Sequence, residues 1–156
     1  MATRQEIQFA QDFLRYVNIM NDLIDVGGIE AQGKEESTGL PIKVPTGVEG
    51  EFRSPTFEEL RERVRGRVQA AGNYYLAMQS AMAKIPAGFL DRGLTGIGID
   101  LQTILTDLED MRNVCDQVLQ DMLLTKDKTE LVNVGTYIEQ NVTRLTLLRR
   151  TWCLGA

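Results

Sequence analysis

The side chains that could do chemistry in this sequence are few, and one residue type is missing altogether. The chain of 156 residues contains no histidine, which removes the commonest general base, the commonest metal ligand and every Ser-His or Cys-His nucleophile pair. Cys115 and Cys153 match no metal-binding spacing. None of the serines lies in a nucleophile elbow, and the glycines of GLTGIGID do not form a phosphate-binding loop. We therefore assign no catalytic residue, metal ligand or cofactor, and we expect a protein that is not an enzyme.

The strongest enzyme-like feature is the segment EELRE, which carries Glu58, Glu59 and Glu62. This segment resembles the EExxE helix motif of the all-α nucleoside triphosphate pyrophosphatases of the MazG family. The resemblance implies a magnesium site that a second acidic helix of ExxD pattern completes. The nearest counterpart is Asp107 with Asp110, a DxxD that lies further along the chain than the family's usual spacing. A magnesium-dependent nucleoside triphosphate pyrophosphatase is therefore the alternative function.

Four arginines follow at once in the segment RERVRGR, which is the other charged motif of the sequence. Alternate positions of a helix point in nearly opposite directions, so the side chains from Arg61 to Arg67 spread around the helix instead of lining one face. Glu59 and Arg63 have the spacing of a favourable ion pair one helical turn apart. The net charge of −5 opposes attraction to nucleic acid and to anionic lipid. We expect a protein partner, with neither nucleic acid nor a membrane.

The elements that carry these residues are helices. Periodic apolar residues and capping pairs predict an all-α fold, a single helical domain over residues 1–156 with four long helices in a bundle. The capping pairs are Thr3 with Glu6, Thr56 with Glu59, and Asp127 with Glu130. Gly27 is expected to end the first helix, and Pro86 stops the second. The predicted helices span residues 4–25, 56–84, 100–124 and 130–151.

Two of these helices carry apolar stripes suited to contacts between helices. The first helix is apolar over more than half its surface, which indicates either burial within the bundle or contact with a second chain. The third helix repeats apolar residues at alternating steps of four and three, the pattern of a narrow seam against a partner helix. The candidate interaction residues of these seams are Phe9, Phe13, Tyr16, Met20, Leu101, Ile104, Leu108 and Met111.

A long irregular connection, residues 27–54, joins the first helix to the second. Its segment LPIKVPTGVEGEF alternates apolar residues with prolines and Lys43, which favours an extended arm laid against another surface. The surface can belong to the same bundle or to a neighbouring chain, and the sequence leaves both interpretations open. The candidate contact residues of this arm are Leu40, Ile42, Val44 and Phe52.

The missing catalytic residues, the broad apolar faces and the arm favour a non-enzymatic structural or adaptor subunit. Such a subunit belongs to a homo-oligomer or a larger particle. Small helical subunits with extended arms resemble components of bacteriophage virions, such as neck, tail or capsid-associated proteins. The sequence has neither an apolar run long enough to span a membrane nor a secretory signal pattern. We therefore expect cytoplasmic synthesis, followed by incorporation into an assembly such as a virion.

Overall fold

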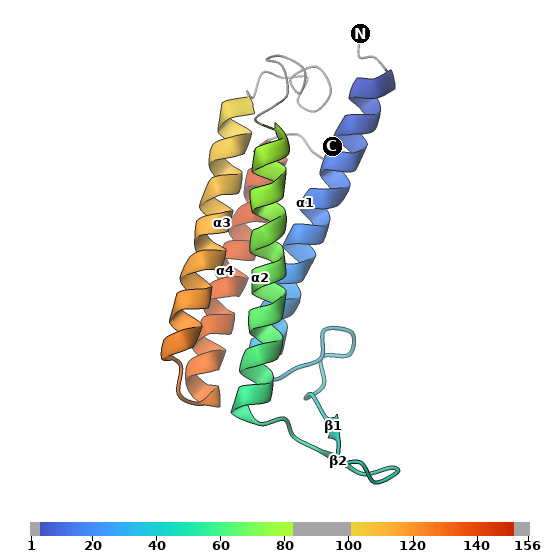
Figure 1. The fold of residues 1–156 in the computed structure, drawn as a ribbon, viewed down its shortest axis with the longest axis vertical. Coiled ribbons are helices and arrows are strands. Elements are labelled where there is room, and N and C mark those ends of the chain that lie inside the picture. The colour runs from blue at the N-terminus through green and yellow to red at the C-terminus, as the bar shows by residue number, and fades with distance from the viewer. Residues whose placement is uncertain (1–3, 83–100, 152–156) are drawn as a thin grey trace.

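The computed structural model describes residues 4–82 and 101–151, and within them it confirms an all-α bundle (Figure 1). Each of four helices packs against the two beside it, so that the helices form a closed ring in the order of the sequence. Consecutive helices run in opposite directions, and α1 begins at the same end of the bundle at which α4 ends. The helices are α1 Arg4–Ala31, α2 Phe57–Met82, α3 Leu101–Leu124 and α4 Lys128–Thr151.

The predicted capping pair at the start of α2 is a reciprocal capping box. The backbone N–H of Glu59 donates to the Thr56 hydroxyl over 3.2 Å, and the backbone N–H of Thr56 donates to the Glu59 carboxylate over 2.9 Å. At the start of α4 the Glu130 N–H donates to Asp127 Oδ1 over 2.9 Å. These bonds satisfy backbone donors that have no partner within the helix. Helices α2 and α4 therefore begin close to where the capping patterns predict, whereas Thr3 of the predicted pair with Glu6 lies outside the described residues.

The end of α1 differs from the prediction, because the helix continues past residue 25 to Ala31. Two residues beyond Ala31, Gly33 terminates the helix with a φ of 77°, the left-handed conformation that favours glycine. The Gly33 N–H donates to the Glu30 carbonyl over 2.9 Å, and the Lys34 N–H donates to the Ile29 carbonyl over 3.4 Å. These two bonds make a Schellman motif. Gly27, expected to terminate the helix, lies instead inside it.

The helical glycines allow close approach of α1 to its neighbours. A Cβ atom on Gly28 would lie 2.9 Å from Ile138 Cγ2 of α4, and one on Gly135 would lie 2.8 Å from the Gly28 carbonyl oxygen. A Cβ on Gly27 would be 3.4 Å from Val68 Cγ2 of α2. Helix α1 thus continues through its glycines because it packs there against two other helices.

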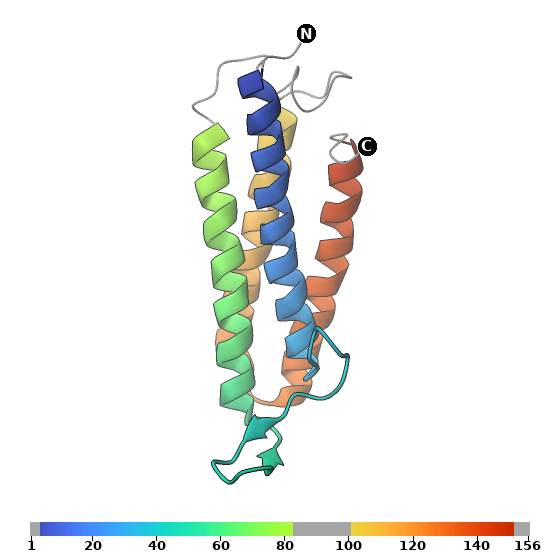
Figure 2. The ribbon, with the colours of Figure 1, turned by 90° about the vertical axis from the view of Figure 1, so that its right-hand side faces the viewer.

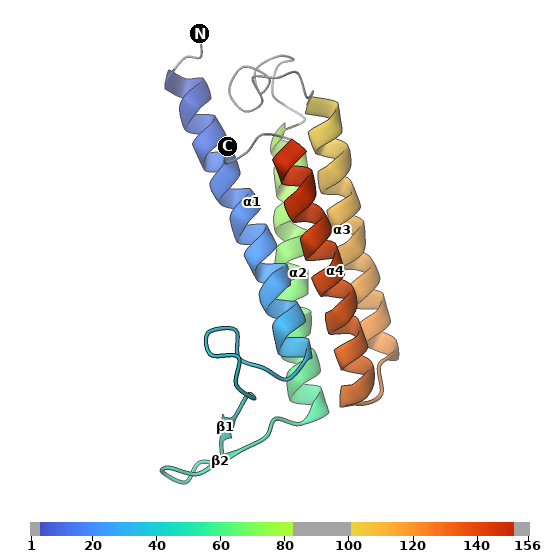
Figure 3. The same cartoon turned by 180° about the vertical axis from the view of Figure 1, so that it is seen from behind.

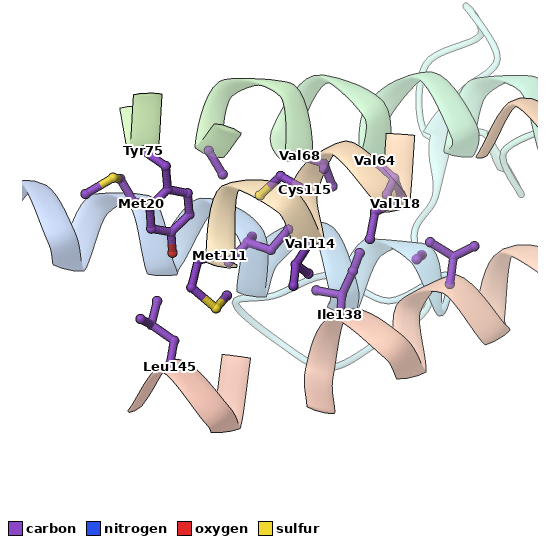
Figure 4. Packing of buried hydrophobic residues seen from close by; sticks show 14 of the residues in the cluster. Met20, Val64, Val68, Tyr75, Met111, Val114, Cys115, Val118, Ile138 and Leu145 are labelled. Atoms are coloured by element: carbon purple, nitrogen blue, oxygen red, sulfur yellow. The ribbon is translucent and has the colours of Figure 1, made fainter. Parts of the chain in front are cut away.

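The core lies along the axis of the bundle, where side chains from all four helices meet. Met20, Tyr75, Met111 and Leu145 come one from each helix and point into the same interior (Figure 4). Of the predicted seam residues, Phe13, Met20, Ile104, Leu108 and Met111 are buried. Tyr16 is partly exposed, and the side chains of Phe9 and Leu101 lie outside the described residues. Burial within the bundle therefore accounts for the five buried seam side chains.

The connection between α1 and α2 is an ordered arm with a small β-hairpin. Strands β1 Val44–Pro45 and β2 Phe52–Arg53 pair antiparallel, with Val44 opposite Arg53 and Pro45 opposite Phe52. Gly47 and Gly50 take positive φ values of 97° and 77° in the loop of the hairpin. Figure 2 shows the arm crossing from the end of α1 to beneath the start of α2.

Candidate protein-interaction site

Two carboxylates of the EELRE segment at the start of α2, Glu59 and Glu62, pair with arginines of the same chain. The Glu59 carboxylate accepts two hydrogen bonds from the Arg53 guanidinium, over 2.6 and 3.0 Å. The hydrogen bonds from Arg53, followed by that from the Thr56 backbone, lower the pKa of Glu59 to about 2. Glu62 pairs with Arg65, and this hydrogen bond lowers the pKa of Glu62. Glu59 therefore secures the arm to α2 through β2.

The acidic pair Asp107 and Asp110 on α3 lies far from the EELRE segment of α2. Glu62 and Met122 line the same small hollow, which places Glu62 beside the C-terminal end of α3. Asp107 lies fifteen positions before Met122 on that helix, a separation of about 22 Å at the helical rise of 1.5 Å per residue. No group of three or more His, Cys, Asp or Glu residues in the described ranges could hold a metal ion. The geometry thus lends no support to a magnesium site built from these residues.

Two of the four arginines of α2 form ion pairs with α1. Arg63 Nε lies 2.9 Å from one oxygen of Glu30, and Arg67 Nε lies 3.4 Å from the other. The side chain of Glu30 on α1 is only 4% exposed, whereas both arginines remain partly exposed. Arg63 pairs with Glu30 and not with Glu59, so the predicted ion pair within α2 is not formed. Arg61 instead lies over the Phe57 ring, with its guanidinium carbon 5.1 Å from the ring centroid.

A group of carboxylates lies where α1, α4 and the arm come together. Burial raises the pKa of Asp25, and the negative charges of Asp22, Glu36 and Glu139 raise it further. The Gln32 amide, one residue past the end of α1, donates to the Glu139 carboxylate of α4 over 3.4 Å. This group adds a local excess of negative charge on the arm side of the bundle.

Some apolar side chains of the arm are buried against the bundle, and others are exposed to solvent. Ile42 is 2% exposed and belongs to the hydrophobic core, and its N–H donates to the Gly33 carbonyl over 2.9 Å. Val44 is half-buried and lines a hollow of about 580 Å³ beside Leu60 of α2. Leu40 and Phe52, by contrast, are 63% and 61% exposed. The arm is therefore fastened to its own bundle at Ile42 and holds other apolar side chains in solvent.

Several exposed apolar side chains were not among the candidate site residues, and three of them lie on the hairpin and at the end of α3. Val48 lies in the loop of the hairpin and is exposed. Leu123 and Leu124 end α3 and are 77% and 75% exposed. The repeat of apolar residues at steps of four and three along α3 stops at Met122. The two consecutive leucines that follow do not occupy positions of this repeat, so they do not face the core. That mismatch is the sequence signal by which they could have been found.

Comparison with known proteins identifies no relative. No protein-family profile matches the chain, and neither a curated protein nor a solved structure is detectably similar to it. Within residues 4–82 and 101–151, no helix is both long enough and apolar enough to cross a membrane.

Proposed function

We propose that this protein is a non-enzymatic structural or adaptor subunit, and that its arm contacts a neighbouring subunit in a homo-oligomer. The observation that carries the proposal is the division of the arm between a buried anchor and exposed apolar side chains. Ile42 fixes the arm on the bundle, while Leu40 and Phe52 remain in solvent.

Single exposed apolar residues are common on protein surfaces and need no explanation. Here the exposed residues share one ordered segment whose conformation is set by the hairpin, by Ile42 and by the Arg53–Glu59 ion pair. A segment that is already ordered loses little conformational entropy when it binds. The arm thus has the properties of a preorganised contact surface.

The same surface suits a place in a larger particle, where each subunit reaches its neighbour through an arm. A bacteriophage neck, tail or capsid-associated protein would be a subunit of this kind. In either setting the protein needs no cofactor, and we expect no magnesium-dependent hydrolysis of nucleoside triphosphates above background.

Static light scattering of the purified full chain tests the proposal. We expect a mass above the 17.5 kDa of one chain for the wild type, and a shift toward one chain mass for Leu40→Ser combined with Phe52→Ser. The matched control is Leu76→Ser with Leu147→Ser, which removes two exposed apolar residues from α2 and α4. The control should keep the wild-type mass, and all proteins should keep the same helical circular dichroism spectrum.

Two results would count against the proposal. A wild type that has the mass of one chain at every concentration would exclude self-assembly. If the wild type assembles and the arm variant has the same mass as the wild type, the exposed residues of the arm take no part in the contact.

A further inference from the structure

The tip of the arm, residues 48–52, combines apolar side chains with unpaired negative charge. Val48 and Phe52 are exposed, and Glu49 and Glu51 lie between them. Neither of these two carboxylates forms an ion pair with a residue that the structure describes. The tip therefore presents an acidic and apolar surface to solvent.

The corner between α3 and α4, residues 123–128, has the complementary character. Leu123 and Leu124 are exposed, and they are followed closely by the exposed residues Lys126 and Lys128. Neither lysine forms an ion pair with any side chain in the described ranges. Asp127, the carboxylate between them, accepts a helix-capping hydrogen bond from the Glu130 N–H. The corner thus presents free ammonium groups beside apolar side chains.

The tip and the corner lie at the same end of the bundle but on opposite sides of it. Figure 1 shows the hairpin at one side of this end and the turn between α3 and α4 at the other, and Figure 3 shows the same separation from behind. A two-fold axis across this end would bring the tip of each copy onto the corner of the other. Contacts of this kind are closed and reciprocal, as two-fold symmetry requires.

We propose that the neighbouring subunit reached by the arm is a second copy of this chain, paired end to end about a two-fold axis. This inference rests on the proposed function and names its partner and both contact surfaces. Glu49 and Glu51 of each copy meet Lys126 and Lys128 of the other, around a contact of Val48 and Phe52 with the leucines of the corner. A stable interface buries about 800 Å² on each partner, so each of the two reciprocal contacts need supply only about half of that area.

Charge reversal on the full chain tests this pairing. One variant carries Glu49→Lys with Glu51→Lys, and the other carries Lys126→Glu with Lys128→Glu. Each variant alone places like charges in both contacts, so we expect a dimer dissociation constant at least tenfold higher than that of the wild type at low salt. An equimolar mixture should recover the dimer, because both contacts of the mixed dimer then join opposite charges. Sedimentation velocity of each variant and of the mixture measures these outcomes.

The matched control is Glu109→Lys with Asp110→Lys, which makes the same change in net charge as Glu49→Lys with Glu51→Lys, on an exposed part of α3 away from the corner. This control should dimerise as the wild type does. Charge variants that dimerise normally, or a mixture that stays dissociated, would overturn the end-to-end pairing while leaving self-assembly through the arm intact. A wild type that is monomeric would overturn both proposals.

Discussion

The buried carboxylate of Glu30 depends on its two arginine partners more than these partly exposed arginines depend on it. If Arg63 and Arg67 are both changed to Gln, a charged group remains in the bundle with no compensating cation, a situation that typically costs about 3 kcal/mol or more. If Glu30 is changed to Gln, the partly exposed arginines can turn toward water, and we expect a loss of only about 1 kcal/mol. Urea unfolding followed by circular dichroism measures both variants. Equal losses of unfolding free energy in the two variants would mean that leaving the Glu30 charge buried without a cation carries no extra cost.

Glu59 should make the stability of the protein depend on pH. Its pKa is lowered from 4.5 to about 2, so its contribution is present above pH 4.5 and is lost as the pH falls toward 2. Glu59→Gln should therefore melt at a lower temperature than the wild type at pH 7, and the difference should shrink below pH 4. The neighbouring Glu58→Gln is the matched control, because Glu58 forms no ion pair with a described residue. Melting curves with a constant difference down to pH 2.5 would contradict this role.

Among the elements, α1 and α4 approach each other closely at Gly28 and Gly135. Gly135→Ala would place a Cβ 2.8 Å from the backbone oxygen of Gly28, and overpacking of this kind costs about 1 to 3 kcal/mol. A Cβ atom added to Gly66 in α2 would meet nothing within 4 Å beyond the backbone of its own helix, so Gly66→Ala should stabilise the protein by about 0.5 to 1 kcal/mol. Thermal unfolding should thus shift in opposite directions for the two substitutions, and a stabilised Gly135→Ala would contradict the close approach.

The arm is the element whose attachment can be tested by a pair of similar substitutions. Ile42→Ala removes a fully buried side chain and should cost about 2 to 5 kcal/mol. Leu40→Ala removes a side chain that is 63% exposed and should change stability by about 0.5 kcal/mol or less. Chemical unfolding of the two variants, at concentrations where assembly is absent, gives the comparison. A small effect of Ile42→Ala would mean that the arm is not fastened through this residue.

The helices were predictable because caps and apolar periods are local signals, and the starts of α2 and α4 fall within two residues of the expected positions. The end of α1 was not predictable from local signals. Gly27 and Gly28, taken alone, indicate a helix end, but tertiary contacts with α2 and α4 hold them in the helix. The alternation in the arm indicated docking without showing which residues dock. Gly39, with φ of 70°, turns the chain immediately before Leu40, and Leu40 is exposed whereas Ile42 lies in the core.

For the molecule as a whole, the order of the helices around the bundle follows the order of the chain. Sequence periodicity indicated four helices with apolar stripes but contained no information on which helices would be neighbours. The positions of the exposed residues at the tip and at the corner depend on that arrangement. Local patterns could identify some of these side chains, but only the folded bundle brings the arm and the end of α3 to one end.

The contact between Gly28 and Gly135 joins the first helix to the last, so it also bears on how fast the protein folds and unfolds. Pairs of consecutive helices close short stretches of chain and form early, whereas α1 and α4 meet only when the ring closes. We therefore expect Gly135→Ala to leave the refolding rate nearly unchanged and to raise the unfolding rate, by about tenfold for each 1.4 kcal/mol of lost stability. Stopped-flow measurements in urea separate the two rates. A slowed refolding rate would place closure of the ring in the folding transition state.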